Sequence, residues 1–257
     1  MSLLTWAGLA ATTFAAALLQ ALGGFGFAVV ATPLYLMFLA PLRAVQLVIL
    51  ISAALCLAVV PGLRRSVAPG LLARLSIGSL AGLPLGLIAL SRSDPKLMRV
   101  LAGTIVLGFA ALLMAVRGRG QPSPPRPMLA LGRGRDVAAG IVAGVATALV
   151  GMAGPPVLVY LLLAGAASQL IRATLLAFFA LVYSATVTAN AATIGIPEQT
   201  WMTAVTLLPC AFGGGAIGRR LGDRLDARGF AMLSIALLAA AGLMTLAAAA
   251  GLIGRPR

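Results

Sequence analysis

The chain has 257 residues, of which 61% are hydrophobic and only 9% are charged, and its mean hydropathy is +1.08. Uncharged runs such as 173–195 and 230–254 reach the roughly 20 residues that cross a bilayer as a helix. This composition excludes a soluble domain, and it lacks the short alternating segments of a β-barrel. It predicts an all-α, polytopic helical membrane protein.

The formal net charge is +14, which on its own would suit a nucleic-acid partner. The basic residues are gathered in short segments between apolar runs, chiefly at 64–65, 117–135 and 219–228. Arginines in such loops are topology signals. The distribution therefore argues against nucleic acid and predicts contact with the headgroups of anionic membrane lipids.

The first predicted element is a helical hairpin over about residues 3–40, broken at Gly24 and Gly26. No basic residue precedes Arg43, so the first run is predicted to be a retained helix, not a cleaved signal peptide. The second arm, about 27–40, is too short to span a bilayer comfortably. Three spanning helices are predicted to follow, over about 44–60, 69–90 and 97–116.

Residues 117–136 form a linker that is too rich in proline and glycine to sustain a helix. A second hairpin follows over about 137–164, broken at Gly151 and Gly154. Its three spans are predicted at about 173–194, 200–218 and 230–253. The chain thus divides into a first transmembrane repeat (1–116), the linker (117–136) and a second transmembrane repeat (137–257).

The two halves carry the same features in the same order, which indicates an internal duplication. The matching residues are Gly24 with Gly151, Arg43 with Arg172, Gly82 with Gly214, Gly86 with Gly218, and Asp94 with Asp226. Glycines four residues apart place small residues on one helix face, so that another helix can approach closely.

Basic residues in the loops favour inverted halves over parallel ones. If each hairpin enters and leaves on one side, the loop arginines and lysine divide twelve against six, leaving aside Arg74 inside a predicted span. If each hairpin crosses once, they divide nine against nine. The positive-inside rule therefore predicts inverted halves with the linker in the cytoplasm.

The paired breaks are the candidate binding site. A helix that restarts at mid-membrane directs unpaired N–H groups and its positive dipole end inwards, and two such ends favour an anion. The alternative, that the glycines only permit tight packing of a re-entrant loop, stays open. The predicted substrate-binding residues are Gly24, Gly26, Gly151, Gly154, Pro155, Arg172, Thr174, Ser184, Thr188 and Asn190.

Two of these assignments have structural alternatives. Arg172 either completes an anion path or anchors a helix end at the membrane surface. The polar residues of 184–190 bind either the substrate or a neighbouring helix.

Acidic residues are few and fall in loops or at helix ends: Asp94, Asp136, Glu198, Asp223 and Asp226. No carboxylate is therefore expected at mid-membrane, which favours an anionic substrate over a cation or a proton relay. The sequence contains no nucleotide-binding loop, metal-ligand cluster or nucleophile–base pair, so neither a cofactor, a bound metal nor an enzyme activity is expected. Cys56 and Cys210 lie in apolar runs and are expected to pack.

The duplicated glycine breaks, with Pro33 nine residues after Gly24 and Arg-Ala before the next helix in each half, resemble the TauE/SafE family of sulfite exporters. Tyr160 stands in the second half where the first has Pro33. The resemblance implies secondary transport of sulfite or an organosulfonate across the plasma membrane, usually of a bacterium. A passive anion channel, or a membrane subunit or scaffold without transport, are the alternatives, and the sequence leaves the oligomeric state open.

Overall fold

The computed structural model describes residues 3–62, 67–92, 94–118 and 132–222, with 242–243 and 247 beyond them. These residues form helices and, within the ranges described, no strands. The helices are α1 (Leu3–Gly23), α2 (Phe27–Phe38), α3 (Pro41–Val59), α4 (Pro69–Arg92), α5 (Pro95–Gly118), α6 (Arg133–Val150), α7 (Gly154–Leu163), α8 (Ser168–Thr193) and α9 (Glu198–Gly222).

Five helices of the described part are long and apolar enough to cross a membrane, namely 3–22, 41–62, 69–90, 169–193 and 198–221. The protein is therefore a multi-pass helical membrane protein, as the composition predicted. α6 has three charged residues in its first turn, Arg133, Arg135 and Asp136, and it is only 18 residues long. α2 and α7, with 12 and 10 residues, are shorter than a bilayer needs.

The backbone conformations that glycine allows account for both predicted breaks. Gly24, Gly26 and Gly151 have φ values of 76°, 126° and 73°, a region that only glycine enters without strain. Gly151 ends α6 in the left-handed conformation, and Pro155 and Pro156 occupy the first turn of α7, where proline fits a helix.

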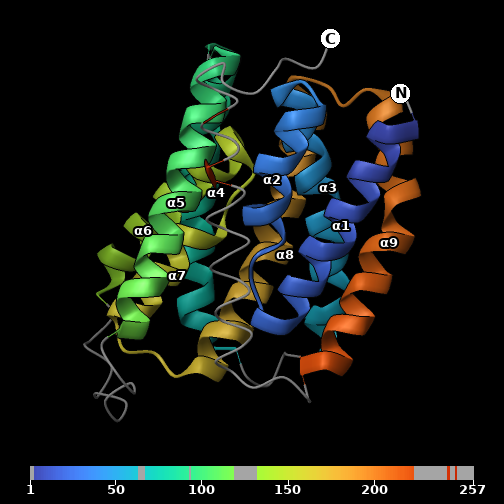
Figure 1. Ribbon diagram of the computed structural model, residues 1–257. Coiled ribbons are helices and arrows are strands. Elements are labelled where there is room, and N and C mark those ends of the chain that lie inside the picture. Colours follow the sequence, from blue (N-terminus) through green and yellow to red (C-terminus); the bar gives the residue numbers. More distant parts are fainter. Residues whose placement is uncertain are drawn as a thin grey trace.

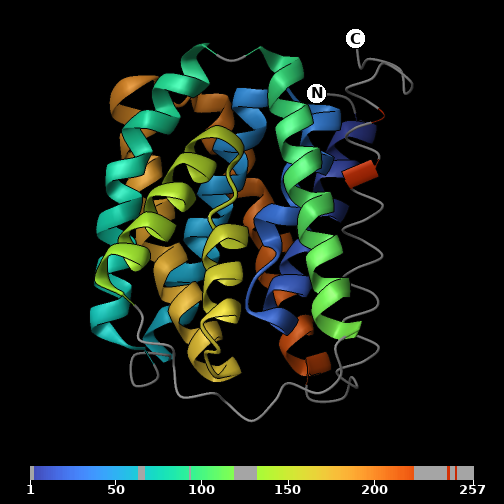
Figure 2. The same ribbon diagram turned by 90° about the vertical axis from the view of Figure 1, so that its left-hand side faces the viewer.

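The two hairpins open towards opposite ends of the helix bundle. In Figure 1, α1 runs from the end where the N-terminus lies to the other end, and α2 returns towards the start. In Figure 2, α6 begins at the opposite end and α7 returns to it, so the direction is reversed. Inverted halves require this arrangement; the inversion itself, and its orientation in a membrane, remain a prediction.

Glycines four residues apart bring two pairs of helices into backbone contact. A Cβ atom added to Gly82 of α4 would overlap the carbonyl oxygen of Ile141 in α6, and one added to Gly214 of α9 would overlap that of Phe14 in α1. Phe14 and Ile141 are 127 positions apart, the same spacing as Gly24 and Gly151. The same close packing thus occurs twice, and packing is what these glycines were predicted to provide.

Several predicted boundaries shift. α5 ends at Gly118 and α6 begins at Arg133, so helix reaches into both ends of the predicted linker. α8 begins at Ser168, five residues before the expected start, because residues 168–172 continue its helical turns. The predicted last span, 230–253, lies outside the described residues except for the few named above.

We expect Gly82→Ala to lower the thermal stability of the protein in detergent. The new methyl group would meet the Ile141 carbonyl and separate α4 from α6, a loss of roughly 1–3 kcal/mol. Gly108→Ala in α5 is the matched control, because no atom lies within 4 Å of its added Cβ, and it should gain up to about 1 kcal/mol from helix propensity. Equal melting temperatures for the two variants would show that the α4–α6 contact does not need glycine.

Candidate functional site

The second arms of both hairpins begin about halfway along the bundle, where α2 and α7 contact each other (Figures 1 and 2). The first four N–H groups of a helix have no acceptor within it. α2 brings four such groups, from Gly26 to Val29. α7 brings only those of Ala153 and Gly154, because Pro155 and Pro156 carry no N–H. The two helix ends are therefore unequal, and α2 is the stronger donor.

Hydroxyl groups from three helices surround the second break. The Tyr183 hydroxyl of α8 donates to the Gly151 carbonyl oxygen at 3.2 Å and lies 3.5 Å from the backbone nitrogen of Ala153. Thr32 Oγ1 of α2 would lie 3.6 Å from a Cβ atom on Gly151. Ser52 of α3 faces the Tyr183 hydroxyl. We name Thr32, Ser52 and Tyr183 the hydroxyl cluster.

The hydroxyl cluster is buried and only partly satisfied. Thr32 and Ser52 are fully buried and Tyr183 is 2% exposed. Thr32 Oγ1 has no hydrogen-bond partner, and Ser52 Oγ interacts with the Tyr183 hydroxyl only outside normal hydrogen-bond geometry. A buried hydroxyl without a partner destabilises a protein by about 1–3 kcal/mol. A buried group of this kind calls for an explanation, such as a bound water, a ligand or another conformation.

The side chain of Arg172 lies against the first break. A Cβ atom on Gly24 would lie 2.5 Å from Cγ of Arg172, whose Nη2 donates to the Ala21 carbonyl oxygen at 3.1 Å. Ala21 is in the last turn of α1, where a cation is favoured by the helix dipole. Arg172 itself is exposed. Gly26 has open space around its Cβ position.

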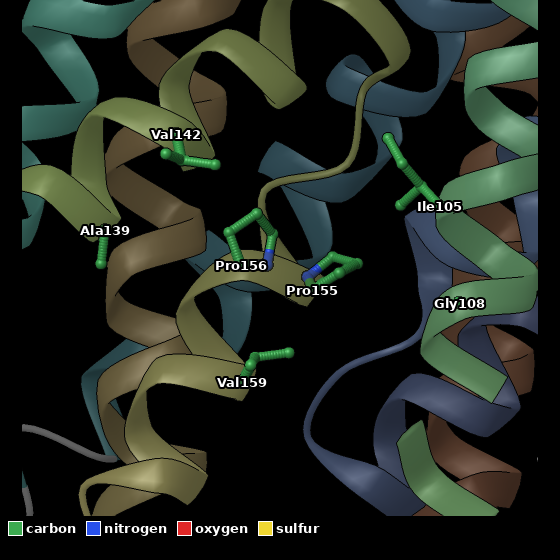
Figure 3. A pocket seen from close by; sticks show the side chains of 7 residues that line it. All are labelled: Ile105, Gly108, Ala139, Val142, Pro155, Pro156 and Val159. Carbon is green, nitrogen blue, oxygen red and sulfur yellow. The ribbon is translucent and has the colours of Figure 1, made fainter. Parts of the chain in front are cut away.

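Gly154 and Pro155 face apolar surroundings. A Cβ atom on Gly154 would lie 3.1 Å from Cζ of Phe179. Pro155 and Pro156 line a pocket of about 420 Å³ between α5, α6 and α7 (Figure 3), together with Ile105, Gly108, Ala139, Val142 and Val159. All these residues are apolar, so this pocket has no side chain that could recognise an anion.

The predicted polar residues of α8 are spread along the helix. Thr174 is fully buried without a partner for its hydroxyl, and the Ser184 hydroxyl is also unpartnered. Thr188 is exposed and donates to the Ser184 carbonyl oxygen, and Asn190 donates to that of Thr186. Thr174 and Asn190 are about 24 Å apart along a helix. The structure therefore does not bring all of them to one small ligand.

The carboxylate of Asp136 is buried, which the sequence did not indicate. It lies in the first turn of α6, as a helix end, but it is fully buried. Nε of Arg74 lies 2.5 Å from its Oδ2, and the Tyr160 hydroxyl donates to its Oδ1. α4 and α7 cover this end of α6, so a residue next to a charged linker is enclosed by neighbouring helices.

Little in the sequence indicated these groups. Thr32, Ser52 and Tyr183 are single polar residues within apolar runs, a pattern that also occurs where such residues only pack. Arg74, an arginine inside an apolar run, was the one signal that a buried counter-charge existed.

We expect Asp136→Asn to lower the free energy of unfolding by about 3 kcal/mol, because it leaves Arg74 without its partner. This is the low end for a buried pair, since the Arg74 side chain is 31% exposed. Glu198→Gln is the control, an exposed acidic residue in the first turn of α9, with an expected loss below about 1 kcal/mol. Thermal unfolding in detergent measures both, and equal losses would rule out a specific role for the Arg74–Asp136 pair.

Comparison with known proteins identifies the family of the chain. The protein-family model of the sulfite exporter TauE/SafE matches residues 9–245. No curated protein and no solved structure gave a significant match. The chain therefore belongs to the sulfite exporter TauE/SafE family, which confirms the resemblance noted from the glycine breaks, and it is a membrane protein of a transporter family.

Proposed function

We propose that this member of the TauE/SafE family is a secondary transporter that carries a small sulfur oxyanion, sulfite or an organosulfonate, across the plasma membrane. The observation that supports this most is the junction of the hairpins. α2 and α7 both begin about halfway along the bundle (Figures 1 and 2) and contact each other, and the hydroxyl cluster lies beside the second break.

The groups at this junction suit an oxyanion. Backbone N–H groups at the start of α2 and the hydroxyls of Thr32 and Ser52 can each donate to a sulfonate or sulfite oxygen. Each helix end contributes roughly 0.3–2 kcal/mol. Since about 4 kcal/mol corresponds to millimolar binding and about 8 to micromolar, a weak site is expected, as a transporter that must release its substrate requires.

The described conformation is closed around this junction, because the members of the hydroxyl cluster are buried. An anion reaches them only when the arms of a hairpin move relative to α3 and α8. Opening first towards one end and then towards the other would give alternating access, with the substrate site near the middle.

We expect the purified protein in liposomes to give saturable flux of radiolabelled sulfite or methanesulfonate. Flux that does not saturate would instead indicate a channel, and no flux with either anion would indicate a subunit or scaffold without transport of its own.

We expect Gly154→Leu to reduce this flux at least tenfold while the protein remains folded. The added side chain would compete with the Phe179 ring for space at the start of α7. Gly134→Leu is the matched control, because this helical glycine of α6 has open space around its Cβ position. Normal flux in Gly154→Leu would place the substrate elsewhere in the protein.

We also propose that the linker is cytoplasmic. A cysteine introduced by Ser123→Cys, in a Cys210→Ala background, should resist a membrane-impermeant reagent in intact cells and react after lysis. Strong labelling in intact cells would reverse the proposed orientation.

A further inference from the structure

Apart from the Gly151 carbonyl oxygen, which accepts from Tyr183, the polar groups at the second break are neutral hydrogen-bond donors, and this restricts the substrate. Resting on the proposed function, we infer that the site selects singly charged sulfur oxyanions, such as hydrogensulfite and alkanesulfonates, over the doubly charged sulfite and sulfate ions.

The cationic side chains are placed away from the hydroxyl cluster. In the described helices, every arginine and lysine lies within six residues of a helix end. Tyr183 is the sixteenth of 26 residues in α8 and Ser52 the twelfth of 19 in α3. Arg172 is eleven residues before Tyr183 in α8, about 16 Å along the helix.

The basic residues on the helices around the hydroxyl cluster already make hydrogen bonds or an ion pair. Arg172 donates to Ala21 at the end of α1, and Arg43 donates to Thr203 in α9. Arg74 pairs with Asp136. Among the described residues, the titratable group that interacts with the Tyr183 phenol is the buried thiol of Cys56 from α3, and neither of these two groups carries a positive charge.

Neutral donors compensate one negative charge that is spread over three oxygens. A second charge on the same small ion raises the desolvation penalty steeply, because this penalty grows with the square of the charge, and it is offset only by a counter-ion. Among the described residues, none beside the hydroxyl cluster carries a positive charge, whereas Arg172 lies against Gly24 at the first break, so the dianions are disfavoured at the cluster.

Hydrogensulfite also carries a proton with it. Sulfite and a proton combine on one side of the membrane, hydrogensulfite crosses, and the two separate again on the other side. The proton is thus bound to the substrate oxygen or sulfur throughout, and no carboxylate at the site is needed to move it.

The first test compares two anions as the pH is raised through neutrality in liposomes. Hydrogensulfite loses its one proton near neutral pH, so at constant total sulfite the flux should fall, approaching a factor of about ten for each pH unit above that pKa. Methanesulfonate stays singly charged, so its flux should remain constant, and sulfate should not compete with it.

The outcomes separate this inference from the proposed function. No flux of either anion at any pH overturns the proposed function. Three results would leave transport standing but overturn the selection of monoanions, provided that methanesulfonate is carried. They are a sulfite flux that stays constant or rises with pH, no sulfite flux at any pH, and competition by sulfate.

The second test uses the unpartnered hydroxyls. Thr32→Val should lower the affinity for methanesulfonate about tenfold, as expected for a lost hydrogen bond to a charged group, while the melting temperature without substrate stays equal or rises. Thr200→Val in α9 is the matched control, since its hydroxyl is also buried and unpartnered, and it should leave the affinity unchanged. Equal affinities in the two variants would remove Thr32 from the site.

Arg172→Gln completes the test. Its affinity for methanesulfonate should change less than twofold, because the guanidinium binds the end of α1. A loss of tenfold or more would place a cation at the site and overturn the inference.

Discussion

Unpaired backbone groups are tolerated inside a membrane only where protein or a polar cavity covers them, and this constraint governs the structure. Both hairpins break a helix at depth, which frees the N–H groups of α2 and the carbonyl oxygen of Gly151. α3 and α8 cross the middle of the bundle and cover the breaks with buried side chains such as Ser52 and Tyr183. The breaks and their cover therefore form one unit.

Close helix packing makes this cover possible. Glycines allow α4 to lie directly against α6, and α9 against α1, so each first arm of a hairpin is held by backbone contact. The second arms lack such contacts in both hairpins. α2 is tied to α1 by the Tyr35 hydroxyl, 2.6 Å from Thr13 Oγ1, and α7 is tied to α6 through Tyr160 and Asp136. The first arms are thus held by backbone contact and the short second arms by side-chain contacts.

Local chemistry explains how much the sequence predicted. Glycine at positive φ and proline in a first helical turn are recognisable residue by residue, so both breaks, both hairpins and the small-residue packing were found. The hydroxyl cluster depends on three helices meeting, and Thr32 and Tyr183 are far apart in the chain. Burial of Asp136 depends likewise on α4 and α7. Properties that arise from packing between distant segments are not visible in single polar residues.

The two ends of the bundle differ in what fastens the second arms. Tyr35 and Thr13 form a neutral contact, in which Tyr35 donates because the Thr13 hydroxyl donates to Leu9. Asp136 joins α7 not only to α6 but also, through Arg74, to α4. The positions equivalent to Asp136 and Tyr160 in the first half, 127 residues earlier, are Leu9 and Pro33, so the charged connection has no counterpart there. A neutral contact within one hairpin is weaker than a charge-assisted contact that spans three helices. The duplicated halves therefore fasten their second arms through different side-chain contacts, neutral in the first hairpin and charged in the second.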